Sequence, residues 1–244
     1  MKLLIVNADD FGYTNGVNTG IIKAHSQGIV TSTSLMVYGK AAKSASQLSK
    51  FPNLSVGLHF QIVNKNLASD IRRKKFLGKQ IIKEINKEFI KQLGIFRAIT
   101  GNQPTHLDSH LHIHTHPEVK SILLRYSKKY SIPVRHFNEV KFFGEFYERS
   151  NPSLKKTSNI DVKSLIKILS EFKDGIGELM CHPGIVDKEL LSISKYSSER
   201  EKELETLTDI KISNYIKDSK IKLVNWTTAF ENRPPVAKAN MTEV

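Results

Sequence analysis

Two periodicities of apolar residues alternate along the chain. Short apolar runs, mostly of β-branched residues, predict strands at residues 2–7, 29–37, 54–60, 133–137, 176–181 and 222–225. Stretches in which apolar residues recur at helical spacing predict helices at residues 17–27, 41–49, 80–94, 117–130, 161–172, 199–207 and 210–218. Strands that alternate with helices in this way are typical of an α/β fold with a largely parallel sheet.

The alternation continues along the chain of 244 residues, which favours a single domain over residues 1–244. Because many βα units follow one another, we expect an irregular (β/α) barrel, similar to a TIM barrel, rather than an open sheet. Two segments depart from the pattern. Residues 137–160 are largely irregular and basic, and are predicted to form an insertion or a lid. Residues 233–244 are polar, contain a pair of prolines, and are predicted to form an extended tail.

Histidine is concentrated in one segment of the chain. The sequence THLDSHLHIHTHP at residues 105–117 contains five of the nine histidines. If the segment is a strand, alternate side chains face opposite sides. The polar face would then carry the even-numbered residues His106, Asp108, His110, His112, His114 and His116. We expect this strand to present metal ligands to a cavity, and a solvated histidine patch or adventitious metal-binding tract is the alternative.

Other polar residues stand where predicted strands end. Asp9 and Asp10 follow the first strand, His59 lies near the end of the third, and His182 follows the strand at residues 176–181. In (β/α) barrels the carboxyl ends of the strands form the catalytic face. We therefore expect these residues and the histidine segment to converge on one site.

Each of these residues also has a purely structural interpretation. Asp9 and Asp10 could cap a turn or a helix. His59 could be a hydrogen-bonded core histidine, and His182 could be a turn residue. Cys181 has no basic neighbour other than His182 to activate its thiol, so it is predicted to be a buried spectator.

Read together, several segments resemble one enzyme family. The segments are NADDFG at residues 7–12, GIVTSTSLMV at 28–37, VGLH at 56–59, PTHLDSH at 104–110 and HPG at 182–184. In this order they are similar to the motifs of the YdjC-like carbohydrate deacetylases, which include chitooligosaccharide deacetylases. Tyr196, Arg200, Glu203 and Leu204 also fit the C-terminal pattern of that family.

The resemblance implies a distorted (β/α) barrel that removes N-acetyl groups from acetylated amino sugars with the help of a divalent metal ion. It implies that Asp10, His59 and His110 hold the ion. Asp9 would then be free to act as the general base, and His182 is the candidate for the general acid.

The resemblance leaves roles open for other residues of the histidine segment. The residues expected to contact the substrate, or to contact and orient the metal ligands, are His112, His114 and Asp108. Leu111 departs from the family, whose members often have Gln at this position. By strand parity residue 111 faces away from the cavity, so the departure leaves the expected metal ligands unaffected.

The family association favours Mg²⁺ as the ion, and Zn²⁺ or Mn²⁺ are alternatives, because a carboxylate with two imidazoles suits several divalent cations. The ion would polarise the amide carbonyl and lower the pKa of a bound water toward about 7. Asp9 would accept the proton of that water. His182 would protonate the leaving amine, which is too basic to leave without a proton.

Composition narrows the choice of partners. The net charge is +13, but the lysines are spread over predicted helices beside glutamates, without a nucleic-acid-binding motif, so we expect no nucleic-acid partner. Cys181 is the only cysteine, and the apolar run at the N-terminus is too short for a signal peptide or a membrane span. These features predict a cytoplasmic protein with a small carbohydrate substrate and no membrane partner, and a homodimer is a possible assembly.

Two other functions fit parts of the sequence. A metal-dependent phosphoesterase or amidohydrolase would also use closely spaced histidines in a barrel, and a carboxylate or a lysine would bridge a second metal in it. A basic sugar- or nucleic-acid-binding protein without catalysis would show salt-dependent affinity for nucleic acid and no acetate release.

Overall fold

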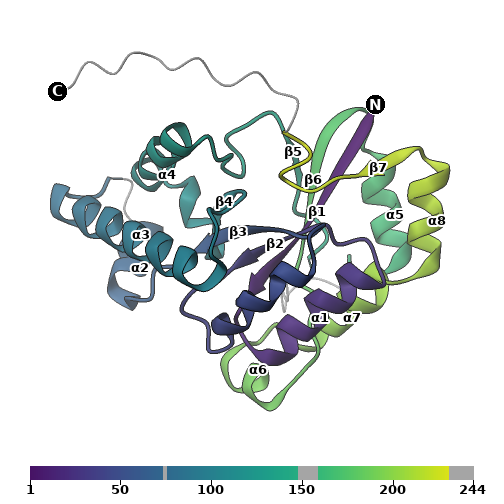
Figure 1. Ribbon diagram of the computed structural model, residues 1–244, viewed down its shortest axis with the longest axis horizontal. Helices are drawn as coiled ribbons and strands as arrows, with labels where there is room; N and C mark the ends of the chain where they lie inside the picture. The colour runs from purple at the N-terminus through teal and green to yellow at the C-terminus, as the bar shows by residue number, and fades with distance from the viewer. Residues whose placement is uncertain (74–75, 148–158, 231–244) are drawn as a thin grey trace.

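A curled, entirely parallel sheet forms the centre of the molecule (Figure 1). The computed structural model describes residues 1–73, 76–147 and 159–230. The strands are β1 (Lys2–Phe11), β2 (Ser32–Leu35), β3 (Ser55–Phe60), β4 (Leu107–Ser109), β5 (Lys141–Phe143), β6 (Gly175–Cys181) and β7 (Ile221–Leu223). Their order is β4-β3-β2-β1-β6-β5, and β7 pairs with the first part of β1. This half-barrel confirms the predicted irregular (β/α) barrel.

Helices cover the outside of the curled sheet (Figure 1). The α-helices are α1 (Asn15–Ser26), α2 (Lys65–Arg73), α3 (Lys79–Thr100), α4 (Pro117–Tyr130), α5 (Val162–Ser170), α6 (Lys188–Ile193), α7 (Ser198–Leu207) and α8 (Ile210–Asp218). Two 3₁₀ segments complete the set, η1 (Ala42–Lys50) and η2 (His110–Thr115). Helix α1 packs against α7, α3 against α4, and α5 against α8. Among the helices of the described ranges, none is both long and apolar enough to cross a membrane.

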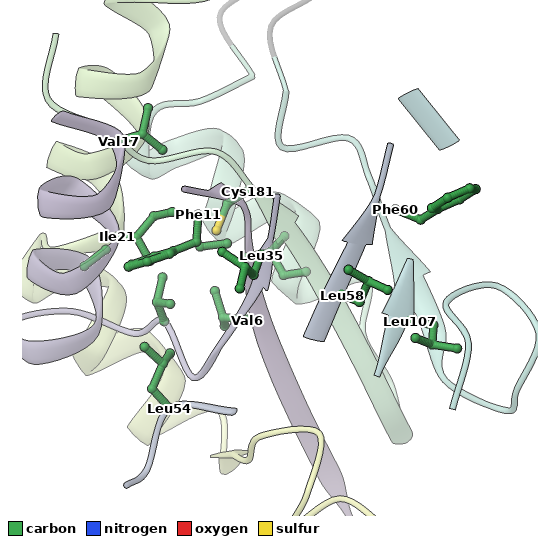
Figure 2. Close-up of a cluster of buried hydrophobic side chains, with 14 of the residues drawn as sticks. Val6, Phe11, Val17, Ile21, Leu35, Leu54, Leu58, Phe60, Leu107 and Cys181 are labelled. Carbon is green, nitrogen blue, oxygen red and sulfur yellow. The ribbon is translucent and has the colours of Figure 1, made fainter. Parts of the chain in front are cut away.

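The main core lies between the sheet and its helices. Helix α1 begins after Thr14, whose hydroxyl accepts a hydrogen bond from the backbone N–H of Val17 and so caps the helix. The same helix buries Val17 and Ile21 against Phe11 of β1 (Figure 2). Cys181 is a buried part of this core, as the sequence predicts for a spectator thiol.

Strand β1 extends beyond the apolar run that predicts it. The run ends at Asn7, but pairing with β2 continues to Phe11, with an irregularity in register between Ala8 and Phe11. Asp9 and Asp10 therefore belong to the strand and are almost fully buried. Hydrophobicity alone predicts the carboxyl end of β1 too early, because two buried carboxylates occupy strand positions where apolar residues are the rule.

The histidine segment is not one long strand. Strand β4 ends at Ser109, and the chain turns into η2, where Leu111 and His112 have left-handed φ angles of 56° and 53°. The Ser109 hydroxyl accepts a hydrogen bond from the backbone N–H of His114 at 2.9 Å and closes the turn. The single polar face expected for residues 105–117 therefore ends at Ser109. Beyond Ser109, an even or odd residue number no longer predicts the side to which a side chain points.

Two other segments differ from their predicted structure. At residues 133–137 only Val134 forms a bridge, a parallel one to Leu107, which extends the sheet past β4. Within the predicted insertion at 137–160, residues Lys141–Phe143 form β5 and pair with β6. Residues 148–158 of that insertion and the predicted tail at 233–244 lie outside the described residues. An insertion that acts as a lid therefore stays a prediction.

Candidate active site

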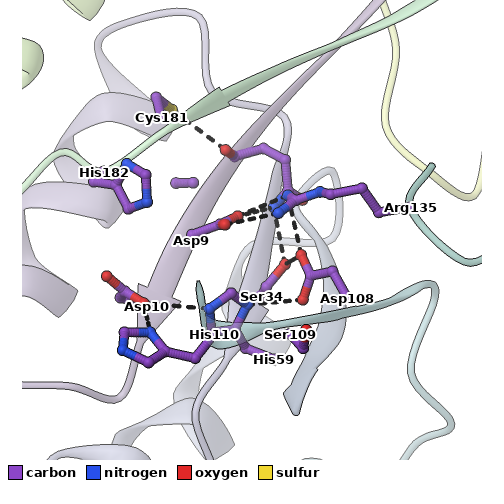
Figure 3. Close-up of polar contacts among 12 residues, drawn as sticks. Asp9, Asp10, Ser34, His59, Asp108, Ser109, His110, Arg135, Cys181 and His182 are labelled. Atoms are coloured by element: carbon purple, nitrogen blue, oxygen red, sulfur yellow. Dashed lines mark hydrogen bonds and ion pairs between the residues drawn. The ribbon is translucent and has the colours of Figure 1, made fainter. Parts of the chain in front are cut away.

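Three side chains of metal-ligand type, Asp10, His59 and His110, meet where β1, β3 and β4 end (Figure 3). Asp10 Oδ1 lies 3.4 Å from His59 Nε2 and 3.4 Å from His110 Nδ1. One ligand atom from each residue lies within 4.8 Å of the other two. Asp10 Oδ1 is buried and has no hydrogen-bond partner among the described residues. An unsatisfied buried oxygen facing two imidazole nitrogens fits a divalent cation.

Asp10 is held in a restricted backbone position. Its φ is 72°, in the left-handed region that residues other than glycine rarely adopt. Arg200, on α7, donates a hydrogen bond from Nη2 to Asp10 Oδ2 at 2.6 Å. Burial alone would raise the pKa of Asp10, but Arg200, His110 and His59 together lower it well below its usual value. Asp10 is therefore ionised, and only Oδ1 is available to a ligand.

Asp108 orients His59 from behind. His59 Nδ1 lies 2.8 Å from Asp108 Oδ1, which leaves Nε2 directed at Asp10. A carboxylate behind a metal-ligating histidine fixes its tautomer in many metal sites. Burial opposes a charged ring, but Asp108, Asp10 and Asp9 raise the pKa of His59 to about 10. A cation must therefore displace a proton from His59, so metal binding should release protons.

Asp9 is not the free carboxylate that the sequence suggests. The Arg135 guanidinium holds it in a two-bond ion pair, with Nη1–Oδ2 and Nη2–Oδ1 distances of 2.7 Å each. Asn7 Nδ2 donates a further hydrogen bond to Asp9 Oδ1 at 2.8 Å. Burial would raise the pKa of Asp9, but Arg135 outweighs it and the pKa is lowered. Asp9 is thus ionised and fixed in orientation.

Arg135 is the central cation of this region, and sequence reasoning misses it. Besides Asp9, its guanidinium contacts Asp108 Oδ2 at 3.0 Å and Glu178 Oε1 at 2.7 Å, and all four groups are buried. Two features of the sequence could have indicated these buried ion pairs, but both are weak. Arg135 follows the short apolar pair 133–134, and Glu178 is a charged residue inside the apolar run of β6. Burial raises the pKa of Glu178 to about 7 despite the nearby Arg135.

His182 follows β6, and in Figure 3 it lies on the side of Asp10 away from His110. Its backbone N–H donates to Glu203 Oε2, and its Nδ1 lies 4.0 Å from Glu203 Oε1. Burial lowers the pKa of His182 to about 4 and raises that of Glu203 to about 8. Near pH 7, then, His182 is neutral, and Glu203 Oε1 accepts a hydrogen bond from the Tyr196 hydroxyl at 2.5 Å rather than from the ring.

The remaining residues of the histidine segment fall into different environments. His106 is buried, and its Nε2 lies 2.9 Å from Ser34 Oγ, which donates to Asp108 Oδ2 at 2.7 Å. His116 pairs with Glu118 at the start of α4. His112 and His114 lie together with His136 rather than with Asp10.

A cavity of about 890 Å³ joins these groups. Its size lies in the range of small-molecule sites. The cavity wall contains the ionisable residues Asp9, Asp10, His59, His110 and His182. It also contains the aromatic residues Tyr13, Phe142, Tyr147 and Tyr196. The predicted metal ligands, base and acid thus line one space, together with rings suited to the apolar face of a sugar.

The sequence matches the family of YdjC-like proteins over residues 3–218, which is most of the chain. This protein belongs to the YdjC-like family. The carbohydrate deacetylase of Brevibacillus brevis is similar to this YdjC-like protein, with 36% identity over 92% of this chain and 98% of the relative. The carbohydrate deacetylase of Clostridium beijerinckii has 34% identity over 91% and 98% of the two chains. The family predicted from the motifs is therefore confirmed.

Solved structures agree on the architecture. A protein of Enterococcus faecalis provisionally named as a cellobiose-phosphate cleavage protein is similar to this YdjC-like protein, with a TM-score of 0.77, 26% identity, and coverage of 93% of this chain and 98% of that one. A family 4 carbohydrate esterase from Streptomyces lividans, solved with acetate, has a TM-score of 0.57 at 10% identity and covers 91% of each chain. The second similarity concerns the fold alone, a deformed barrel.

Proposed function

We propose that this YdjC-like protein hydrolyses the N-acetyl group of acetylated amino sugars such as chitooligosaccharides. The observation that carries the proposal is the convergence of Asp10, His59 and His110 with Asp9 and His182 around one cavity. The relatives named carbohydrate deacetylases support the same substrate class. A cytoplasmic location and a homodimer stay predictions from the sequence.

Asp10, His59 and His110 would hold the metal ion of such a reaction. Their donor set of one carboxylate and two imidazoles accepts Mg²⁺, Mn²⁺ or Zn²⁺, and we favour Mg²⁺. A divalent ion bound there would polarise the amide carbonyl and make a nearby water more acidic. Asp108 would keep His59 in the tautomer that presents Nε2 to the ion.

Asp9 would act as the general base. Its ionised carboxylate can accept a proton from the attacking water, and it lines the same cavity as the metal ligands. Arg135 fixes the direction of the carboxylate and lowers its pKa, so Asp9 is a weak but permanently available base near pH 7.

His182 would act as the general acid for the leaving amine. Because its pKa is about 4, the ring is neutral near pH 7 and must receive a proton before it can donate one. Glu203 accepts a hydrogen bond from the His182 backbone N–H, and its Oε1 lies 4.0 Å from His182 Nδ1, beyond hydrogen-bond distance. We infer that Glu203 is a positioning residue for His182.

Acetate release tests the proposal directly. Purified protein with Mg²⁺ should release acetate from diacetylated chitooligosaccharide, and a chelator should abolish the release until metal is restored. Hydrolysis of phosphate esters without acetate release would favour the phosphoesterase alternative. Salt-dependent nucleic-acid binding with neither hydrolysis would favour the non-catalytic alternative, and either result would overturn the proposal.

Asp9, His59 and Asp108 form a second group of potential metal ligands beside the first. Arg135 pairs with two of them, which argues against a second, bridged metal ion there. Their ligand atoms also lie within 4.8 Å of one another, and His59 is common to both clusters. The Arg135 guanidinium, however, already pairs with Asp9 and Asp108. The positively charged Arg135 guanidinium therefore occupies the position that a second metal ion would need in a dinuclear hydrolase.

A further inference from the structure

A second group of histidines lies on the wall of the cavity. His112 and His114 belong to η2, and His136 follows the bridge at Val134. One ring nitrogen of each histidine lies within 4.8 Å of the other two. The ring centroids are 5.7 Å (His112–His114), 5.5 Å (His112–His136) and 5.3 Å (His114–His136) apart. His112 and His136 line the cavity, whereas His114 is fully buried.

Two ring nitrogens of this group lack a hydrogen bond. His114 Nε2 and His112 Nδ1 are buried without a partner among the described residues. Leaving a buried polar atom unsatisfied costs about 1–3 kcal/mol. The other ring nitrogen of His114, Nδ1, lies 2.6 Å from Ser109 Oγ. In the tautomer in which Nδ1–H donates to Ser109 Oγ, His114 Nε2 carries a free lone pair, which is the usual form of a metal-ligating histidine.

The His114 and His136 rings are neutral near pH 7. Burial lowers the pKa of His114 to about 2 and that of His136 to about 4. Arg135 also lowers these pKa values, but its own charge is paired with Asp9 and Asp108. No proton has to leave these rings near pH 7 before metal binds.

The backbone at two of the three positions is strained. His112 has φ 53° and His136 has φ 67°, both in the left-handed region. Such a conformation costs a residue other than glycine about 1–3 kcal/mol and persists only where its surroundings impose it. Two of the three rings are thus carried by backbone positions that the surrounding fold imposes, which distinguishes the cluster from loose surface side chains.

We propose that His112, His114 and His136 form a second metal site, which binds Zn²⁺ and rejects Mg²⁺. Three imidazoles without a carboxylate suit zinc, whereas magnesium requires oxygen ligands. The site shares no ligand with Asp10, His59 and His110, so a variant in one group leaves the ligand side chains of the other in place. Because His112 and His136 line the cavity, an ion held by this group would be reachable from the substrate space.

Metal counting tests the site apart from catalysis. Stripped protein is dialysed against buffered Zn²⁺ or Mg²⁺, and bound metal per chain is measured by mass spectrometry. We expect two zinc ions in the wild type, one in His110→Ala, one in His136→Asn, and none in the double variant. Magnesium should not exceed one ion and should be unchanged by His136→Asn. Asparagine is chosen because it tolerates a left-handed φ.

Two further measurements guard against misfolding and nonspecific binding. His112→Asn, which also keeps a residue tolerant of its φ, should lose the same single zinc ion as His136→Asn. His25→Asn, in α1 and outside both clusters, should keep both. With Co²⁺, the His110→Ala protein should absorb strongly in the visible, as four-coordinate cobalt does, and the double variant should not.

The outcomes separate this proposal from the proposed function. One zinc in the wild type that disappears in His110→Ala would overturn the second site, even if acetate is released with Mg²⁺. Two zinc ions retained in both His136→Asn and His112→Asn would overturn it as well. Loss of one zinc in these variants would support it even if acetate release is never observed.

Discussion

Asp10 uses its two carboxylate oxygens for different purposes. Oδ2 accepts a hydrogen bond from Arg200, and Oδ1 faces His59 and His110 without a hydrogen bond of its own. One oxygen thus anchors the side chain while the other stays available to an ion. The left-handed φ of Asp10 makes this arrangement possible, because the strand irregularity before Phe11 turns the side chain toward β3.

The role of His110 can be tested by removing its ring. His110→Ala should lose the ion of the Asp10 centre together with acetate release, since one carboxylate and one imidazole bind a divalent cation weakly. Metal content with Mg²⁺ and acetate release are the two measurements. His25→Ala serves as the control, because His25 lies in α1 away from the cavity. Full activity of His110→Ala would remove this residue from the site.

The role of Asp9 predicts a different outcome from that of His110. Asp9→Asn should keep the metal, because Asp10, His59 and His110 are intact, but it should lower kcat by about 10²–10⁴, the usual contribution of a general base. Asparagine retains one of the two oxygens that Arg135 contacts and replaces the other with an NH2 group, so thermal unfolding of the variant is measured alongside kcat. Turnover at the wild-type rate would assign the base to another group, and loss of metal would make Asp9 a ligand.

Among the elements, β3 shows how a close approach between strands supports the site. Gly57 leaves room for His106 of the neighbouring chain segment: an added Cβ would lie 2.4 Å from His106 ring atoms. The His106 ring stacks on Trp226, with centroids 4.9 Å apart, and contacts Ser34. Ser34 in turn donates to Asp108, which orients His59. Gly57, two residues before His59, thus supports the orientation of His59 indirectly, because it leaves space for the His106 ring.

Gly57→Ala should therefore destabilise the protein and disturb the site together. Forcing a methyl group into a packed core costs about 1–3 kcal/mol, and displacement of His106 would also weaken metal binding at His59. Thermal unfolding and metal affinity are the measurements. Gly94→Ala, in the middle of α3 with no atom within 4 Å of an added Cβ, is the matched control. It should stabilise the protein by up to about 1 kcal/mol.

Over the whole molecule, buried charges connect parts of the chain that are remote in sequence. Arg135 joins β1, β4 and β6 through Asp9, Asp108 and Glu178. Arg200 and Glu203 of α7 reach Asp10 and His182 at the ends of β1 and β6. These contacts hold the open half-barrel around the cavity, where main-chain pairing between strands does not close the ring.

Glu203 makes the stability of the molecule depend on pH. Its pKa is about 8 in the folded protein against 4.5 for an unperturbed glutamate, so the folded state binds more protons in this range. Folding stability from this residue is therefore complete below about pH 4.5 and is lost as the pH rises toward 8.

A matched variant isolates this contribution. Glu203→Gln, which keeps an acceptor for the His182 N–H, should show a smaller fall in melting temperature between pH 5 and pH 8 than the wild type, both stripped of metal. The difference between the two melting curves removes the effects of other groups such as Glu178 and His59. Parallel curves would contradict a protonated Glu203.

The sequence determined the alternation of strands and helices, the YdjC-like motifs and the convergence of polar strand ends. These are local properties: apolar periodicity reports which face of an element is buried, and parallel strands bring their carboxyl ends to one edge. The proximity of Asp10, His59 and His110 follows from that rule, since all three stand at strand ends.

Only the tertiary structure decided how these residues are held. Arg135 and Arg200 contact carboxylates that are 27 to 190 positions away in the sequence, from Asp108 to Asp10, and no local pattern records such pairs. The left-handed turn at Leu111 and His112 ended the parity argument, because Ser109 closes a bend where alternation predicts an extended strand. That turn moved His112 and His114 away from Asp10 and placed them beside His136, where partners are set by packing rather than by sequence spacing.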